Sequence, residues 1–266
     1  GESRDSMDIG LPGVQEELIK RLRKTGKPVI VILLSGGALS LKPDSADAVL
    51  QAWYPGQAGG TAIADIVFGA VSPSGKLPVT VYKNVKQLPA FESYEMKGRT
   101  YRYFKGTPLY PFGHGLSYSK FKYSDFRIKR KAGNFAVNVK LKNTGRVKAA
   151  EVVQLYIALP GAGKTSPIKQ LAGFEKIQLA PGEKKGVKFT VSPGQLQAIN
   201  QKGEREAVYG DFVFWAGGAQ PGYEKMNPCT QVLRKKIRIN PPVSGRPAVW
   251  SVYILKCADG TLYTGI

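Results

Sequence analysis

Apolar residues in the first third of the chain follow a helical spacing and then the spacing of a buried strand. Val14, Leu18 and Leu22 recur at helical intervals among charged residues, which predicts an amphipathic helix over 14–24 that packs through this apolar edge. The β-branched run over 28–34 is typical of a strand buried on both faces. A helix followed by such a strand predicts a parallel α/β sheet. We expect further elements over 46–53, 60–68 (a helix) and 77–81 (a strand).

Beyond Phe121 the apolar spacing changes to two. Apolar residues alternate with polar or small ones over 135–142 and again over 187–191. Turn residues follow at 143–145, 180–183 and 216–218. This pattern predicts about seven antiparallel strands in a β-sandwich of fibronectin type III or immunoglobulin type.

These patterns divide the chain into four segments. Residues 1–118 are predicted to form a partial, flavodoxin-like α/β domain, whose last part is dense in aromatic residues and has no clear period. Residues 119–239 follow as the β-sandwich. A polar, proline-rich linker is expected over 240–249, and the tail over 250–266 is too short for a core of its own. The fold class is therefore α/β followed by all-β.

The charge of the chain is strongly positive and unevenly placed. The 266 residues carry a net charge of +20, of which residues 1–120 hold +5 and the remainder +15. In the second half the basic residues often alternate along predicted strands, as Lys140 and Lys142 do, which is typical of the solvated face of a sheet. No aromatic residues are interleaved with them to stack on bases, so nucleic-acid binding is disfavoured.

Composition excludes several other classes. The longest apolar stretch, over 29–34, is far shorter than a membrane helix needs, and the first residues contain no basic and apolar leader. Two cysteines, Cys229 and Cys257, do not make a disulfide scaffold or a cysteine-rich zinc site, and the single His114 excludes a site built on two histidines. No cofactor is expected, and the cellular location stays unassigned.

Local motifs that can carry chemistry favour a structural interpretation. The stretch Gly161-Ala162-Gly163-Lys164-Thr165 imitates the end of a P-loop, but Ala158 stands where the first glycine belongs and Pro167 stands where the helix should start. Gly59-Gly60 can receive an anion at the start of a helix, although close packing against the sheet is the more frequent reason for such glycines.

A serine hydrolase site is not expected either. Ser35 lacks the Gly-x-Ser-x-Gly elbow, and His114 lies between two glycines that predict a tight turn. His114 is therefore interpreted as structural.

A series of short motifs points to one family. The motifs are Gly1-Glu2-Ser3 and residues 8–15, 25–30, 52–57 with 59–60, 73–78, 98–104 and 109–118, with 143–145, 152–156 and 171–176 in the sandwich. In this order they resemble the C-terminal half of a bacterial glycoside hydrolase of family 3, of the β-glucosidase type, together with its fibronectin-III-like domain. The resemblance covers residues 1 to about 239.

The resemblance implies retaining hydrolysis of terminal β-linked glucose from glucosides or oligosaccharides, with two carboxylates. The aspartate nucleophile of that family lies on an N-terminal (β/α)8 barrel that has no counterpart here, so the isolated chain is expected to be inactive. Glu2, nine residues before Leu11, matches the position of the general acid/base. Ser6 stands where the family has an arginine, and Arg4 is the nearest substitute. The implied partners are a β-glucoside substrate and the missing barrel.

The tail has a different resemblance. Residues 250–266 are similar to the opening hairpin of a GIY-YIG nuclease domain, with Tyr253 and Tyr263 at its two motif tyrosines. Two alternatives therefore stay open beside the β-glucosidase. One is a non-catalytic interaction module whose basic sandwich binds polysaccharide, an acidic surface or a second copy in a homodimer. The other is part of a DNA-processing fusion.

Overall fold

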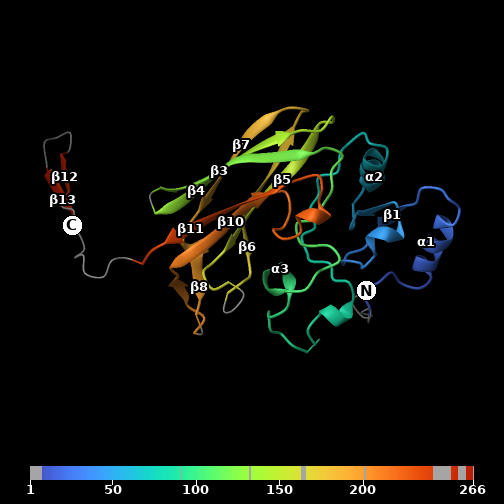
Figure 1. The fold of residues 1–266 in the computed structure, drawn as a ribbon, viewed down its shortest axis with the longest axis horizontal. Helices are drawn as coiled ribbons and strands as arrows, with labels where there is room; N and C mark the ends of the chain where they lie inside the picture. Colours follow the sequence, from blue (N-terminus) through green and yellow to red (C-terminus); the bar gives the residue numbers. More distant parts are fainter. Residues whose placement is uncertain are drawn as a thin grey trace.

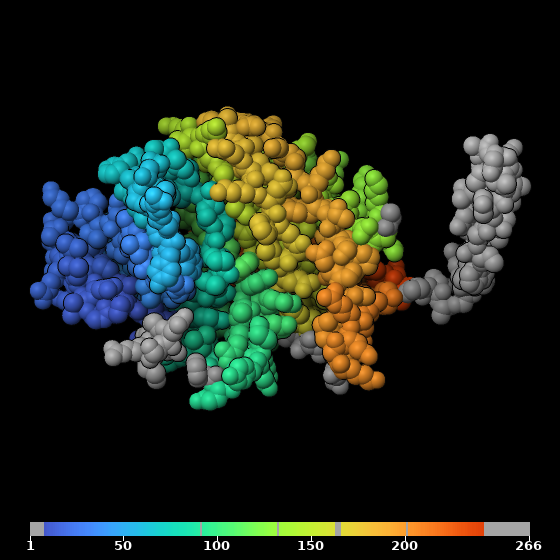
Figure 2. Space-filling model, turned by 180° about the vertical axis from the view of Figure 1, so that it is seen from behind, coloured from blue at the N-terminus to red at the C-terminus, as the bar shows by residue number. Residues whose placement is uncertain are grey.

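The computed structural model describes residues 8–90, 92–131, 133–162, 166–200 and 202–241, and the backbone of 253–256 and 262–265. An α/β part lies at one end of the main body and a β-sandwich at the other (Figure 1). In Figure 2 the blue and cyan residues of the α/β part gather at one end in the same way. The predicted order of α/β followed by all-β is confirmed.

The α/β part contains the predicted helix, strand and helix. Its elements are α1 (Gln15–Arg23), β1 (Ile30–Leu33), β2 (Ala48–Gln51) and α2 (Gly59–Val67). Strands β1 and β2 pair in parallel, with Ile30 opposite Ala48. The short element expected over 46–53 is thus the second strand of a parallel sheet.

Two expectations about burial in this part are wrong. The apolar edge of α1 faces away from the protein, with Val14 79% and Leu18 55% exposed, and the helix instead buries Ile19, which is 7% exposed. Strand β1 is buried on one face only, because Ile30 and Ile32 are exposed while Leu33 is buried. Within the described residues, the elements that would cover the second face of the sheet are absent.

The strand predicted over 77–81 is also wrong. The backbone N–H groups of Leu77 and Val81 donate to the carbonyls of His114 (2.8 Å) and Tyr110 (2.9 Å), but only an isolated bridge forms at Val81. Pro78 lies between these two contacts and has no N–H to donate, which prevents a continuous ladder.

The aromatic segment after residue 81 connects the two parts. It contains a short 3-10 turn, η2 (Val85–Gln87), and one turn of α-helix, α3 (Thr100–Tyr103). Tyr101 stacks on Phe112 with ring centroids 4.1 Å apart, and both rings meet Tyr156 of the sandwich edge-on. The aromatic residues therefore form packing between the two parts.

The sandwich consists of two antiparallel sheets. The first sheet is β3-β4-β7 and the second is β11-β10-β5-β6. The bounds are β3 (Phe121–Lys131), β4 (Asn134–Asn143), β5 (Ala149–Ala158), β6 (Gln170–Leu179), β7 (Lys184–Val191), β10 (Gly210–Gly217) and β11 (Val232–Ile239), with a small pair of strands, β8 (Gln197–Ile199) and β9 (Arg205–Ala207). The predicted seven-stranded sandwich is confirmed by these two sheets.

Burial in the sandwich follows the predicted alternation. Phe135, Val137, Val139 and Leu141 of β4 all point into a core of 20 buried residues from both sheets. The α/β part has a far smaller core, formed by Ile19, Leu33 and Leu41. The hairpin expected in the tail is present as β12 (Tyr253–Lys256) paired antiparallel with β13 (Leu262–Gly265).

Candidate functional site

The proposed acid/base, Glu2, lies outside the described residues. The description begins at Asp8, whose Oδ1 atom accepts hydrogen bonds from the N–H groups of Ile9 (2.7 Å) and Gly10 (3.3 Å). The Ile9 carbonyl accepts a hydrogen bond from the Ser40 N–H at 2.7 Å, in the loop that follows β1. Residues 8–10 are therefore held beyond the carboxyl end of a parallel strand, the edge at which open α/β sheets bind ligands.

Loops from the aromatic segment reach the same place. The Ser40 hydroxyl donates to the Lys83 carbonyl at 2.7 Å, and the Tyr110 hydroxyl donates to the Leu41 carbonyl at 3.2 Å. Three segments that are distant in sequence therefore lie together next to the first described residues. They are 8–10, 39–41 and 83–110. This is the region of the described structure nearest in sequence to Glu2.

A second polar site lies buried between the α/β part and the sandwich. We call Lys76, His114, Tyr123, Glu151 and Thr230 the junction cluster. The Lys76 ammonium lies 3.6 Å from the Glu151 carboxylate, which is 1% exposed. Glu151 also accepts hydrogen bonds from the hydroxyls of Tyr123 (3.3 Å) and Thr230 (3.2 Å). The buried Glu151 carboxylate is therefore satisfied by the Lys76 ammonium of the α/β part and by two hydroxyl groups of the sandwich.

Burial dominates the electrostatics of the junction cluster. It lowers the pKa of Lys76 and raises the pKa of Glu151, and the opposite charge of each partner works against these shifts. Burial also raises the pKa of Tyr123 well above its usual value. Burial, followed by the positive charge of Lys76, lowers the pKa of His114 to about 4. His114 is therefore neutral at neutral pH.

The turn around His114 is wedged between the two parts. Gly113 has a positive φ of 74°, and its carbonyl accepts a hydrogen bond from Gln154 of β5 at 3.1 Å. A Cβ atom on Gly113 would collide with the same Gln154 side chain, and one on Gly115 would collide with the Gly75 carbonyl. The glycines of this motif therefore permit close approach of the two parts, which supports the structural interpretation of His114.

Sequence reasoning missed the pair Lys76 and Glu151. Glu151 is the one acidic residue within the β5 sequence, which is otherwise almost entirely buried. A carboxylate in such a strand requires a buried partner, and this was the available signal. Since both side chains are enclosed and mutually bonded, the junction cluster joins the two parts and offers no open position to a substrate.

The other motif residues have local roles. A Cβ atom on Gly59 would press on Pro55, whereas one on Gly60 would meet open space, so close packing explains the first glycine alone. The Ser35 hydroxyl donates to the Gly37 carbonyl at 2.8 Å within its own loop. The Cys229 thiol donates to the Ser117 carbonyl at 3.2 Å. Most of the P-loop-like stretch and Cys257 lie outside the described residues.

A clustered metal site and a membrane-spanning helix are both absent from the described residues. No group of three or more His, Cys, Asp or Glu side chains in that part of the chain could hold a metal ion. No helix found there has the length and apolar character needed to cross a membrane.

Curated relatives are glycosidases. The chain is 46% identical over 183 residues to a xylan 1,4-β-xylosidase of Xylanibacter ruminicola, a match covering 67% of this chain and 21% of that protein. It is 39% identical over 234 residues to a periplasmic β-glucosidase of Salmonella typhimurium, covering 81% of this chain and 31% of that protein. The chain thus spans about a fifth to a third of the length of the curated relatives it matches.

Solved structures agree in fold. A β-glucosidase of Listeria innocua in complex with glucose superposes with a TM-score of 0.74 at 30% identity, over 89% of this chain and 34% of that one. A family 3 β-glucosidase of Bifidobacterium adolescentis gives a TM-score of 0.78 at 28% identity, over 94% and 39%. The model of the glycosyl hydrolase family 3 C-terminal domain matches residues 1–118, and that of the fibronectin type III-like domain matches residues 151–220. The chain therefore carries the C-terminal domain of glycosyl hydrolase family 3 joined to a fibronectin type III-like domain.

Proposed function

We propose that this chain supplies the acid/base side of a retaining β-glycosidase whose nucleophile lies on a separate barrel domain. Glu2 protonates the leaving glycosidic oxygen in the first step and activates water in the second. The substrates are terminal β-glucosides or β-xylosides, the classes named for the curated relatives. The chain by itself has no nucleophile and is inactive.

One observation carries this proposal: the uncovered apolar surface of the α/β part. It has two separate parts, all of whose residues are exposed: Val14, Leu18 and Leu22 on the outer side of α1, and Ile30 and Ile32 on the face of β1 opposite to Leu33. Parallel strands occur almost only in sheets whose two faces are both covered by other elements. Their apolar side chains point outward from both faces and have to be shielded from water. Such a surface favours a further part of the same protein packing here.

We assign this surface to additional chain of the hydrolase rather than to a homodimer. Strand β1 pairs with β2 on one side, and its other edge has no partner strand among the described residues. A parallel sheet is normally completed by strands and helices of its own domain.

The position of the residues that follow Glu2 in sequence supports its role in this scheme. Residues 8–10, which follow it closely, are fixed beyond the carboxyl end of β1 by the contact between Ser40 and Ile9. A carboxyl group at that edge can face a sugar bound between this part and a barrel. The acid/base role requires a carboxyl group that gives up its proton in the first step and takes one back in the second.

The boundaries and the tail complete the proposal. We place the partial α/β domain at 1–118, the sandwich at 119–239, the linker at 240–249 and the tail at 250–266. Neither family model extends into the tail, so its likeness to a GIY-YIG nuclease remains an expectation from sequence. Neither alternative, a solely non-catalytic module or a DNA-processing fusion, has an observation in its favour comparable to the glycosidase relatives.

The test compares Glu2→Ala with the wild type in the longer protein that includes the barrel. With a dinitrophenyl β-glucoside, whose leaving group needs little protonation, the variant should form the glycosyl-enzyme and stall, and azide should restore turnover. With an alkyl β-glucoside the first step should slow by about 10² to 10⁴, and azide should have no effect.

Asp5→Ala is the matched control, because it removes a carboxylate from the same segment. It should leave both substrates near wild-type rates. If Glu2→Ala lowers both substrates equally and azide rescues neither, the acid/base role of Glu2 is refuted. Turnover of an aryl β-glucoside by the purified 266-residue chain would refute the inactivity of the chain alone.

A further inference from the structure

The outer face of the sheet β3-β4-β7 carries a row of lysines across its three strands. Lys122 of β3 lies opposite Lys142 of β4, and Lys142 lies opposite Lys184 of β7. We call Lys122, Lys142 and Lys184 the lysine row. Neighbouring strands lie about 4.8 Å apart, so the three lysine side chains start from backbone positions that form one line across the sheet.

More positive charge borders the row. Two residues further along β3 and β4 from the lysine row, Ser124 lies opposite Lys140. In the next row, Asn138 lies between Arg127 of β3 and Lys188 of β7. The Lys140 ammonium forms an ion pair with Asp125 at 2.7 Å. Over the residues that the structure describes, none of the three lysines of the row has an ion-pair partner.

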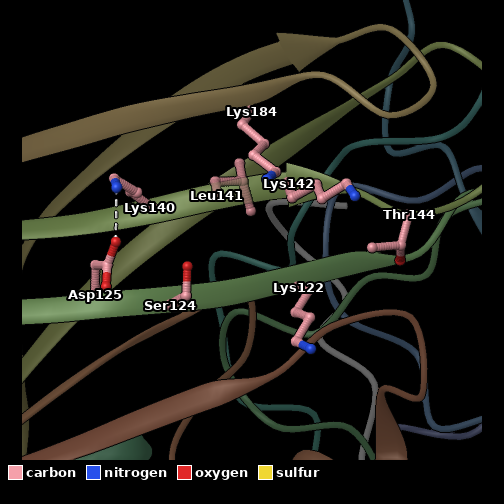
Figure 3. Close-up of a pocket in the computed structure, with 8 residues that line it drawn as sticks. All are labelled: Lys122, Ser124, Asp125, Lys140, Leu141, Lys142, Thr144 and Lys184. Atoms are coloured by element: carbon pink, nitrogen blue, oxygen red, sulfur yellow. Dashed lines mark ion pairs between the residues drawn. The ribbon is translucent and has the colours of Figure 1, made fainter.

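The row lines a hollow in the surface. The hollow has a volume of about 450 Å³ and is lined by Lys122, Ser124, Asp125, Lys140, Leu141, Lys142, Thr144 and Lys184. Figure 3 shows Lys122, Lys142 and Lys184 extending from three adjacent strands, with Lys140 and Asp125 joined to one side. The Ser124 hydroxyl and the side chains of the three lysines therefore border the same hollow.

Stability of the fold does not explain the row. Like charges directly opposite each other on neighbouring strands are destabilising. Alternating positions on a solvated face accept either sign of charge, and a sheet gains from opposite charges across strands. Three unpaired lysines in one line are therefore better explained by a ligand that supplies negative charge.

We propose that the lysine row binds the carboxylates of an acidic polysaccharide, such as a chain of uronic acids, as a site separate from catalysis. A uronic-acid chain carries one carboxylate on each sugar ring, so it offers several negative charges to the ammonium groups of the row. The choice of a glycan over other polyanions rests on the proposed glycosidase function. The lining has no aromatic side chain, which disfavours stacking on neutral sugars and on nucleic-acid bases.

The test uses the 266-residue chain and two triple variants. The row variant is Lys122→Gln with Lys142→Gln and Lys184→Gln. The control variant is Lys24→Gln with Lys27→Gln and Lys86→Gln, three exposed lysines of the α/β part, so both variants lose the same charge. Binding of a galacturonic acid oligosaccharide is measured by titration calorimetry at low and at higher salt, with a neutral xylan oligosaccharide and duplex DNA as comparisons.

The expected result is that the row variant binds the uronic-acid oligosaccharide about tenfold or more weakly, while the control variant stays within about twofold of the wild type. The neutral oligosaccharide should not bind, and higher salt should weaken the acidic one. Equal losses in both variants would overturn the proposal, because net charge alone would then explain binding. Tighter binding of DNA than of the oligosaccharide at equal salt would overturn the choice of ligand.

Folding of the row variant is checked by the midpoint temperature of its thermal unfolding. This temperature should not fall below that of the wild type, since the variant removes repulsion between the lysines. Lys142→Glu, which reverses only the central charge, gives an independent readout with the same expected loss of binding. Since no turnover is measured, failure of this proposal leaves the role of Glu2 untouched, and failure of Glu2 leaves this result untouched.

Discussion

His114 shows how one residue can resemble a catalytic group and serve a different purpose. Its ring lies against Tyr110, with centroids 5.3 Å apart, and its backbone N–H and carbonyl bond to Pro111 and Leu77. Its Nδ1 atom is buried with no hydrogen-bond partner among the described residues. Protonation at this site would place a positive charge beside Lys76 in an enclosed space, which is why the neutral form is favoured.

This arrangement predicts a pH dependence of stability. Between pH 6.5 and about 4 the unfolded chain holds the histidine proton and the folded chain does not. The unfolded state then binds more protons, so the free energy of unfolding falls as the pH falls through this window. The contribution of His114 should be about 2 to 3 kcal/mol, present above pH 6.5 and lost by pH 4.

The measurement is urea unfolding at a series of pH values for the wild type and for His114→Asn. His114 is the single histidine of the chain, and the carboxylates are common to both proteins, so the difference between the two curves isolates this residue. The difference should vary between pH 6.5 and 4 and stay constant above pH 7. Parallel curves through this window would contradict the lowered pKa of His114.

At the scale of elements, α1 shows that apolar spacing can predict a helix without predicting which side of the helix is buried. The spacing of Val14, Leu18 and Leu22 does produce a helix, and Glu16 and Glu17 near its start with Arg21 and Arg23 near its end support it electrostatically. The stripe nevertheless stays exposed, and the adjacent Ile19 provides the contact with Leu33 and Leu41. The helix therefore makes an apolar contact on its inner side and carries exposed apolar residues on its outer side.

Two neighbouring substitutions should separate these faces. Ile19→Ala should lower the free energy of unfolding of the 266-residue chain by about 2 to 4 kcal/mol, because it leaves a cavity in a small core. Leu18→Ala should change it by less than about 0.5 kcal/mol, because that side chain is exposed.

Denaturant unfolding followed by far-ultraviolet circular dichroism is the measurement for this pair of variants. In the longer hydrolase the cost of Leu18→Ala should rise, since we propose that its face is covered there. An equal cost for both variants in the 266-residue chain would show that the outer stripe is already covered in solution, as a homodimer would do.

At the scale of the whole molecule, two unequal cores are joined by a polar contact. The sandwich has 20 residues in its core and the α/β part has three. Between them, the Gln154 amide donates to the Gly113 carbonyl (3.1 Å), the Asn227 amide donates to the Gly115 carbonyl (3.0 Å), and the Lys76 ammonium lies 3.6 Å from the Glu151 carboxylate. These contacts hold the parts together without enlarging the small core of the α/β part.

The inequality predicts a gradient of local stability. Amide hydrogens of β1 (Ile30–Leu33) should exchange with solvent at least about tenfold faster than those of β5 (Ala149–Ala158), because opening the small core costs less free energy. Hydrogen exchange followed by mass spectrometry on the 266-residue chain measures this difference.

Strand β10 (Gly210–Gly217) is the internal control, since it shares the core of β5 and should exchange as slowly. In the longer hydrolase, protection of β1 should increase while that of β5 stays constant. Equal protection of β1 and β5 in the 266-residue chain would contradict the assignment of an incomplete α/β part.

The sequence alone determined those features that depend on local spacing and on motifs. Alternation over 135–142 predicted which side chains of β4 enter the sandwich core, because the period of a strand leaves no choice of face once one side is apolar. The ordered series of motifs between residues 1 and 176 identified the family, and the two glycines beside His114 predicted a tight turn. The first helix, the first strand and the second helix of the α/β part were likewise predicted from the order of apolar runs, whereas the element at 46–53 was expected without its type and is strand β2 (Ala48–Gln51).

Tertiary structure decided which surfaces meet and which stay open. Spacing marks Val14 and Leu18 as apolar but does not contain the partner that covers them, so burial of that edge was predicted wrongly. The pairing of Lys76 with Glu151 joins residues 75 positions apart, and the lysine row forms only when β3, β4 and β7 lie side by side. Local sequence sets the direction of each side chain within its element, whereas contacts between distant elements depend on how the whole chain packs.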